Sequence, residues 1–171
     1  MKSIFASIFV LLFSLSLFRA QENADAVLKT SLETAKKENK NVLLFFHASW
    51  CGWCKLMEKN MQAESTQAYF SRNFVLASVD VMESEKKKYL ENPGGEKLLL
   101  KYAGRETGLP FWIILDKDGK ILTDSFNEKG ENLGSPASPE EVEIFVSKLQ
   151  KTTAITPEEI AAVKKVFIKE N

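Results

Sequence analysis

The sequence predicts an α/β sandwich in which helices cover a mixed β-sheet, and three observations support this prediction. Helical patterns of apolar residues alternate with short apolar runs along the chain. Residues 42–46 are apolar at every position, which is typical of a strand buried on both faces. Residues 111–125 contain two apolar runs around an Asp-Gly turn, a pattern that indicates an antiparallel hairpin.

Length and composition indicate one globular domain. The chain has 171 residues, of which 44% are hydrophobic and 11% aromatic, which is enough for one packed core and not comfortably for two. Lys and Arg together number 23, as do Asp and Glu, so no surplus of either sign indicates a nucleic-acid partner or a solvating acidic tail. Net charge therefore identifies no partner.

Residues 1–20 differ in composition from the rest of the chain. Lys2 supplies a positive start, and residues 4–18 are apolar apart from scattered serines, which predicts a secretory signal peptide. Cleavage after Ala20 would leave the large Phe18 at a position that usually holds a small residue, so the cleavage site is open. An uncleaved anchor is the alternative, although the apolar run is short for a bilayer, which needs roughly 20 residues. We therefore expect an exported chain, either periplasmic or secreted.

The first part of the mature chain is predicted to alternate helices and a strand. Residues 24–40 carry apolar residues three and four positions apart, which predicts an amphipathic helix before the buried strand at 42–46. Residues 53–62 follow a helical pattern after the first cysteine. A second short helix is expected over residues 65–72, with Ser65 as its cap.

The middle of the chain is predicted to complete the sheet. A strand is expected over residues 74–81. Residues 84–102 are charged and helix-prone, but a turn sequence at 92–95 interrupts them, so we expect two short helical pieces. The strands of the hairpin are expected at residues 111–115 and 120–125.

The last part of the chain is predicted to hold a loop and two helices. Residues 127–139 are rich in Gly, Ser and Pro, and Ser138 followed by Pro139 indicates the start of a helix that ends near residue 151. Thr156 repeats this start, and the apolar stripe after it predicts a last helix packed on the domain. The expected division is a signal peptide at 1–20, a domain at 21–155 and a C-terminal helix at 156–171.

The chain has two cysteines, Cys51 and Cys54, which follow the buried strand and open a helix. A sulfur at a helix N-terminus faces free N–H groups and the positive end of the helix dipole, and both favour the thiolate. The spacing lets the second sulfur attack a mixed disulfide formed at the first. Gly52 leaves the approach to Cys51 open, whereas Trp53 covers part of the surface beside it. The pattern therefore predicts a redox-active pair.

Other uses of two cysteines are less consistent with the sequence. A zinc site needs four ligands, and only His47 and carboxylates are available to complete one, so a structural zinc would have to bridge two chains. Haem attachment requires a histidine directly after the second cysteine, where this chain has Lys55. A permanent structural disulfide is the remaining alternative, but closing so short a loop removes little chain entropy. We expect no metal, nucleotide or organic cofactor.

Two segments resemble the thioredoxin superfamily. Residues 46–55, with the sequence FHASWCGWCK, are similar to its active-site segment, and residues 107–111, with the sequence TGLPF, are similar to its cis-proline loop. The order of elements over residues 24–150 fits that fold as well. Residues 36–39 and 74–80 resemble in particular the exported subgroup related to the catalytic domains of periplasmic disulfide-interchange proteins. The resemblance implies a thioredoxin-like three-layer sandwich, with a central mixed sheet flanked by helices and an extra C-terminal helix.

The resemblance also implies a role for individual residues. Cys51 would be the exposed attacking sulfur and Cys54 the buried resolving sulfur. Pro110 would follow a cis peptide bond and lie against the cysteines, where the backbone of Leu109 pairs with an extended substrate; an ordinary proline at a strand edge is the alternative. Trp50 would pack beside the site, or it is simply a core tryptophan.

The chain departs from the thioredoxin pattern near the cysteines. Thioredoxins have a buried acid six residues before the first cysteine, which helps to move the proton of the resolving thiol, and this chain has Phe45 there. A carboxylate elsewhere in the chain, a water molecule, His47 or Glu58 are the candidates to replace it, although a lone histidine is often structural. Lys55 either supports the thiolate or is simply solvated. Trp53 stands where related proteins have proline or histidine, so the motif gives no reduction potential.

The sequence thus predicts an exported thiol-disulfide oxidoreductase that acts on protein thiols and disulfides as a reductase or isomerase, with an oxidant as the second choice. A reductase outside the cytosol would need electrons from a membrane-embedded donor. The alternative is a binding module that uses the groove beside Pro110 without redox turnover. The apolar stripe of the last helix also suggests dimerisation, and the substrate proteins and the oligomeric state stay open.

Overall fold

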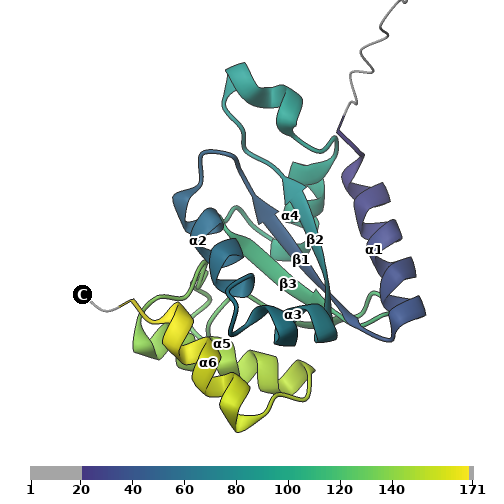
Figure 1. The fold of residues 1–171 in the computed structure, drawn as a ribbon. Coiled ribbons are helices and arrows are strands. Elements are labelled where there is room, and N and C mark those ends of the chain that lie inside the picture. Colours follow the sequence, from purple (N-terminus) through teal and green to yellow (C-terminus); the bar gives the residue numbers. More distant parts are fainter. Residues whose placement is uncertain (1–20, 170–171) are drawn as a thin grey trace, which may run out of the picture.

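The structure, a computed structural model, describes residues 21–169, so the predicted signal peptide at residues 1–20 lies outside the described residues. Four strands form one sheet in the order β2, β1, β3, β4, with helices on both faces (Figure 1). In this part of the chain, no helix is long and apolar enough to cross a membrane. The strands are β1 (Asn41–His47), β2 (Phe74–Asp80), β3 (Phe111–Leu115) and β4 (Ile121–Asp124).

Strand pairing makes the sheet mixed, as predicted. β1 is parallel to β2 and antiparallel to β3, and β3 and β4 form the predicted hairpin. Residues 42–46 of β1 are all buried, which confirms the prediction from their apolar sequence. The register pairs His47 with Asp80 at the end of β1. Because the cysteine motif follows directly after β1, the place where this interior strand ends sets the position of the motif in the fold.

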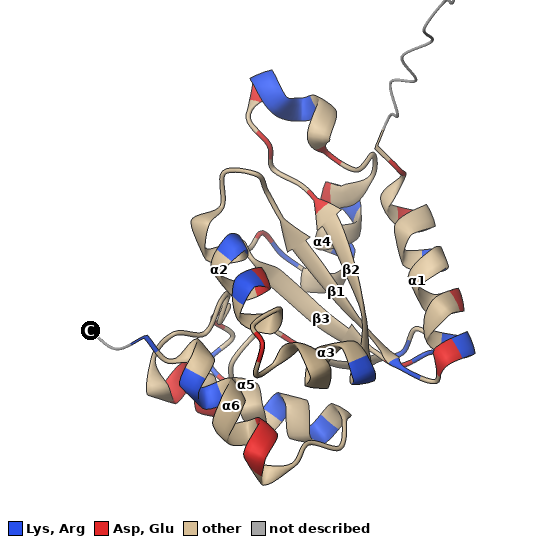
Figure 2. Cartoon of the chain, viewed as in Figure 1, with Lys and Arg blue, Asp and Glu red and all other residues tan. Residues whose placement is uncertain are grey.

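Each face of the sheet has its own apolar cluster, because side chains alternate between the faces of a strand. Leu43, Phe45 and Trp112 belong to one cluster, whereas Leu44 and Phe46 belong to the other. The first cluster is covered by α2 (Gly52–Met61), α3 (Gln67–Asn73), α5 (Pro139–Thr152) and α6 (Pro157–Phe167), and the second by α1 (Ala24–Glu38) and α4 (Gly95–Ala103). The predicted three-layer sandwich with an extra C-terminal helix is confirmed. Figure 2 shows charged residues mainly on the helices and loops around this core.

Capping residues explain where several helices begin and end. At the start of α1, the side chain of Asn23 accepts the N–H of Asp25. The helix ends at Glu38 rather than at residue 40, because Asn39 takes a left-handed conformation with φ 51°. Helices α5 and α6 begin with capping boxes at Ser138 and Thr156, which confirms their predicted starts.

One local prediction is wrong. Ser65 does not cap α3: the helix begins after Thr66, whose hydroxyl donates to the carbonyl of Asn60 at 2.5 Å instead of capping the helix. The charged segment forms the two short helical pieces that were predicted, and the first of them is a 3₁₀ helix, η1 (Glu85–Leu90). It buries none of its residues, so it lacks the packed apolar face from which most helices in proteins gain stability.

Helix α6 is part of the folded core. Val163 and Phe167 are fully buried on the side that faces α5 and α2. The ring centre of Phe167 lies 5.1 Å from that of Phe145 and 6.3 Å from that of Phe70. The last helix therefore completes the aromatic cluster on one face of the sheet.

Phe167→Ala is expected to lower the free energy of unfolding by about 3–5 kcal/mol, because it removes a buried ring and leaves a cavity. Lys165→Ala changes an exposed residue of the same helix and is expected to shift this free energy by less than about 0.5 kcal/mol. Urea denaturation of the oxidised proteins measures both values. Equal stability of the two variants would show that α6 is not part of the core.

Candidate active site

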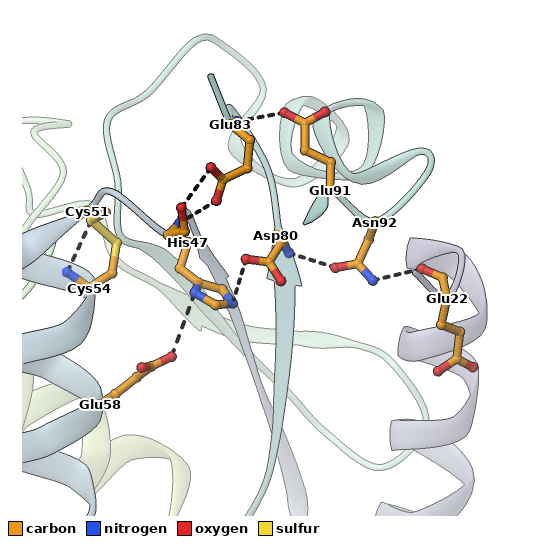
Figure 3. Close-up of polar contacts among 10 residues, drawn as sticks. Glu22, His47, Cys51, Cys54, Glu58, Asp80, Glu83, Glu91 and Asn92 are labelled. Carbon is orange, nitrogen blue, oxygen red and sulfur yellow. Dashed lines mark hydrogen bonds and ion pairs between the residues drawn. A yellow bond between two sulfur atoms is a disulfide. The ribbon is translucent and has the colours of Figure 1, made fainter. Parts of the chain in front are cut away.

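The two cysteines lie where β1 ends and α2 begins. A tight turn follows β1, in which the N–H of Cys51 donates to the carbonyl of Ala48 at 3.0 Å. Cys51 is the N-cap of α2, and its sulfur accepts the N–H of Cys54 at 3.1 Å. The two residues form a disulfide with their Cα atoms 5.3 Å apart (Figure 3). The positive end of the α2 dipole therefore faces the sulfur of Cys51.

Both cysteines are buried in this disulfide form, since Cys51 is 3% exposed and Cys54 1%. The expectation that Cys51 is the exposed sulfur is therefore wrong for the oxidised protein. The disulfide and the hydrogen bond hold its sulfur against Cys54, within the apolar cluster. A Cβ built on Gly52 would meet no atom within 4 Å, so the space over the motif is open at that residue.

Two tryptophans flank the disulfide at the surface. Trp50 is 58% exposed and Trp53 is 50% exposed, so Trp50 is not a core residue. The indole N–H of Trp50 donates to the carbonyl of Met82 at 2.7 Å, which fixes the orientation of its ring. Lys55 is also exposed, one residue after the motif. The surface around the disulfide is thus aromatic with a basic neighbour.

A groove of about 380 Å³ lies beside the motif, between Trp53, the loop before β3 and the loop after β4. The Leu109–Pro110 peptide bond in the first of these loops is cis. The side-chain amide of Asn132, in the second loop, donates to the carbonyls of Gly108 at 2.8 Å and Pro110 at 3.0 Å. These bonds fix the two loops relative to each other. The role of Asn132 was not predictable from the sequence, because its partners are backbone groups of a distant segment.

His47 lies between two carboxylates, as Figure 3 shows. Its Nδ1 is 3.7 Å from a carboxylate oxygen of Glu58, and its Nε2 is 3.5 Å from one of Asp80. Neither contact has the geometry of a hydrogen bond, and Nε2 is buried without such a partner. The ring stacks on Phe45, the residue at the position of the thioredoxin acid. The sequence candidates His47 and Glu58 are therefore brought together.

Asp80 adds a partly buried carboxylate that the sequence did not single out. Burial raises the pKa of Asp80 above its ordinary value; His47 acts in the opposite direction, and the charges of Glu83 and Glu91 raise the pKa further. Only the strand register, which pairs Asp80 with His47, could have indicated it. The imidazole of His47 thus lies between the carboxylate of Glu58 on α2 and that of Asp80 on β2.

Glu83 positions the turn that precedes Cys51. Its carboxylate is buried and accepts both the backbone N–H and the hydroxyl of Ser49, the latter at 2.9 Å. The N–H of Glu83 in turn donates to Glu91 at 2.7 Å. Trp50 also donates a hydrogen bond to Met82. Two adjacent residues of the segment after β2, Met82 and Glu83, therefore hold the turn that precedes Cys51. Glu83 is one of several neighbouring acids, and no local pattern distinguishes it from the others in the sequence.

The site thus contains a disulfide, one imidazole and several carboxylates. Within residues 21–169, no group of three or more His, Cys, Asp or Glu side chains is placed to hold a metal ion. The chemistry that these groups can perform is thiol-disulfide exchange with local proton transfer.

Comparison with known proteins agrees with this geometry. The family model of the thioredoxin-like domain matches residues 28–128. Over 94 residues the chain is 30% identical to the thiol:disulfide interchange protein DsbD of Pseudomonas fluorescens. The aligned part is 55% of this chain and 15% of that protein, so the chain spans a small fraction of the length of this relative.

The chain is also similar to two solved structures. The disulphide isomerase from Xylella fastidiosa Temecula1 matches with a TM-score of 0.54 and 23% identity, over 74% of this chain and 91% of that one. The C-terminal domain of DsbD from Neisseria meningitidis, in its oxidised form, matches with a TM-score of 0.48 and 22% identity, over 78% of this chain and all of that one. The isomerase structure supports the fold.

Glu83→Ala is expected to lower the free energy of unfolding of the oxidised protein by about 1–3 kcal/mol, because the partly buried N–H of Ser49 loses its acceptor. Glu85→Ala removes the same charge from an exposed residue of the same segment and is expected to change this free energy by less than about 0.5 kcal/mol. Chemical denaturation gives both numbers. A Glu83 variant as stable as the Glu85 variant would contradict the positioning role.

Proposed function

The chain belongs to the thioredoxin-like domain family, and from this premise we propose that it is a protein thiol-disulfide oxidoreductase. The observation that carries the proposal is the disulfide at the N-terminus of α2, next to the groove that the Leu109–Pro110 loop lines. A helix N-terminus stabilises a thiolate, which is the nucleophile in disulfide exchange. The similarity to a thiol:disulfide interchange protein supports the same activity.

The proposed reaction begins with the reduced pair. The thiolate of Cys51 attacks a substrate disulfide, the substrate S–S bond breaks, and one substrate sulfur leaves as a thiolate. The thiolate of Cys54 then attacks the mixed disulfide at Cys51 and releases the second substrate sulfur. Two electrons pass to the substrate, and the protein ends in the disulfide form. We assign the attack to Cys51 because its sulfur is at the N-cap, and the resolution to Cys54 because it lies within the helix.

Proton transfer at the resolving thiol is assigned to Glu58 and His47. Phe45 cannot accept a proton, whereas Glu58 follows Cys54 by one helical turn and so lies on the same face of α2. Its carboxylate contacts His47, which in turn faces Asp80. The proton of the Cys54 thiol would pass to this group when Cys54 attacks.

The remaining site residues are assigned to substrate contact and to support of the thiolate. Leu109 and Pro110 line the groove across from Trp53 and are the proposed substrate-binding residues. Gly52 leaves room for the approaching disulfide. Lys55 is exposed beside the motif, and we assign its positive charge to support of the thiolate. Trp50 is assigned as the second aromatic side chain at the edge of the site.

The direction that we propose is reduction or isomerisation of protein disulfides. Glu58, Asp80 and Glu83 place three partly or fully buried carboxylates around His47 and Ser49. By contrast, the ammonium groups of Lys55 and Lys87 nearby are exposed and therefore screened by solvent. Negative charge destabilises a thiolate, and a less stable reduced form makes a dithiol a stronger reductant. Electrostatics around the site therefore favour donation of electrons.

The proposed location is outside the cytosol, in the periplasm or the extracellular space, after removal of residues 1–20. Support comes from the composition of residues 1–20 and from the similarity to an interchange protein. The domain would then comprise residues 21–155, with 156–171 as its C-terminal helix. Since a reductase in such a compartment needs an electron supply, we propose a membrane-embedded donor as its partner.

Cys54→Ser is expected to accumulate a mixed disulfide with a protein substrate, because the intermediate at Cys51 is no longer resolved. Cys51→Ser is the matched control and is expected to trap much less, because the attacking sulfur is gone. Non-reducing gel electrophoresis with a disulfide-bonded test protein, followed by mass spectrometry of the adduct, measures both. If neither variant traps substrate and the wild type never turns over a disulfide, the activity is absent and the fold serves as a binding module.

A further inference from the structure

The end of the extra C-terminal helix contacts the active-site helix. Phe167 is buried and fixes the last turn of α6 in the core. Two residues later, the N–H of Lys169 donates to the carbonyl of Ala137 at 2.9 Å. The ammonium of Lys169 lies 4.7 Å from the centre of the Trp53 ring. A residue outside the sheet and its connecting helices thus reaches the edge of the active site.

Both partners of Lys169 line the groove beside the disulfide. Trp53 forms one side of this groove, opposite the Leu109–Pro110 loop, and Ala137 lies in the loop that closes it. A substrate segment that occupies the groove must therefore pass close to the ammonium group. The face of an indole ring attracts an ammonium group through its quadrupole.

In the part of the chain that the structure describes, the carboxylate that lines the groove near Lys169 is engaged by backbone N–H groups. This carboxylate belongs to Glu141 and accepts the N–H groups of Ala137 and Ser138, both at 3.0 Å. Burial acts to raise the pKa of Glu141, but these hydrogen bonds outweigh burial, and the net effect is a lowered pKa. The negative charge of Glu141 is therefore held at the N-terminus of α5. None of the ion pairs within residues 21–169 includes Lys169. Figure 2 shows the basic end of α6 on the same side of the molecule as α2.

Resting on the proposed oxidoreductase function, we propose that Lys169 is a specificity-determining residue that favours substrates with an acidic side chain within three residues of the reacting cysteine. An extended segment advances about 3.3 Å per residue, so a side chain at this distance can reach from the disulfide to the Trp53 edge of the groove. The ammonium attracts a carboxylate there and repels a lysine. Selection by charge is therefore a property that the C-terminal helix adds to the domain.

The test uses disulfide-linked peptides that are identical except for Glu, Gln or Lys flanking the cysteine. Stopped-flow turnover by the reduced protein at low salt gives kcat/KM for each peptide. The wild type is expected to prefer the Glu peptide over the Lys peptide by about threefold to fivefold, as for an exposed ion pair, and added salt is expected to reduce this ratio. Lys169→Arg is expected to keep the ratio, Lys169→Met to remove most of it, and Lys169→Glu to invert it.

The matched control is Lys151→Glu, which makes the same charge change on an exposed residue at the far end of α5 and is expected to leave the ratio unchanged. A wild type that turns over the peptides with no preference, or a preference that survives in Lys169→Glu, overturns the inference and leaves the proposed function intact. Absence of turnover with every peptide overturns the proposed function itself.

Discussion

Cys51 can cap α2 because the buried strand β1 ends at His47 and the chain then makes one tight turn. This junction depends on the apolar residues 42–46, which place β1 in the interior of the sheet. The cap position gives the Cys51 sulfur the N–H groups and dipole of the helix, and Cys54 lies one turn further on. The disulfide, the groove beside it and the carboxylates of Glu58, Asp80 and Glu83 all lie around the junction of β1 and α2.

Two long-range sets of contacts hold the junction in place. Glu83 accepts both polar hydrogens of Ser49 on one side, and the amide of Asn132 fixes the Pro110 loop on the other. Neither residue takes part in the proposed exchange. Both position groups that do, and an exchange reaction between sulfurs depends on such positioning because the attacking and leaving atoms must be aligned.

Local patterns predicted most of this architecture, whereas contacts between distant segments were not predictable. Hydrophobic periodicity and capping residues were enough to predict the helices and strands, because these signals involve residues close together in the sequence. The capping boxes at Ser138 and Thr156, for example, each join residues three positions apart. The cysteine motif could be recognised because its strand and helix are adjacent in sequence. Glu83 and Lys169 were missed because their partners lie far along the chain and are defined only by the fold. The burial of both sulfurs likewise follows from tertiary packing and from the disulfide itself.

The central claim is that the Cys51–Cys54 pair is a reversible redox centre whose acidic surroundings make it a reductant. The equilibrium reduction potential of the mature chain, titrated against glutathione or a stronger dithiol, tests this most directly. We expect full cycling, with a reduction potential nearer to the thioredoxin value of about −270 mV than to that of a strong oxidant at about −120 mV. A value near the oxidant figure would contradict the proposed direction, and a pair that does not cycle would contradict the redox function.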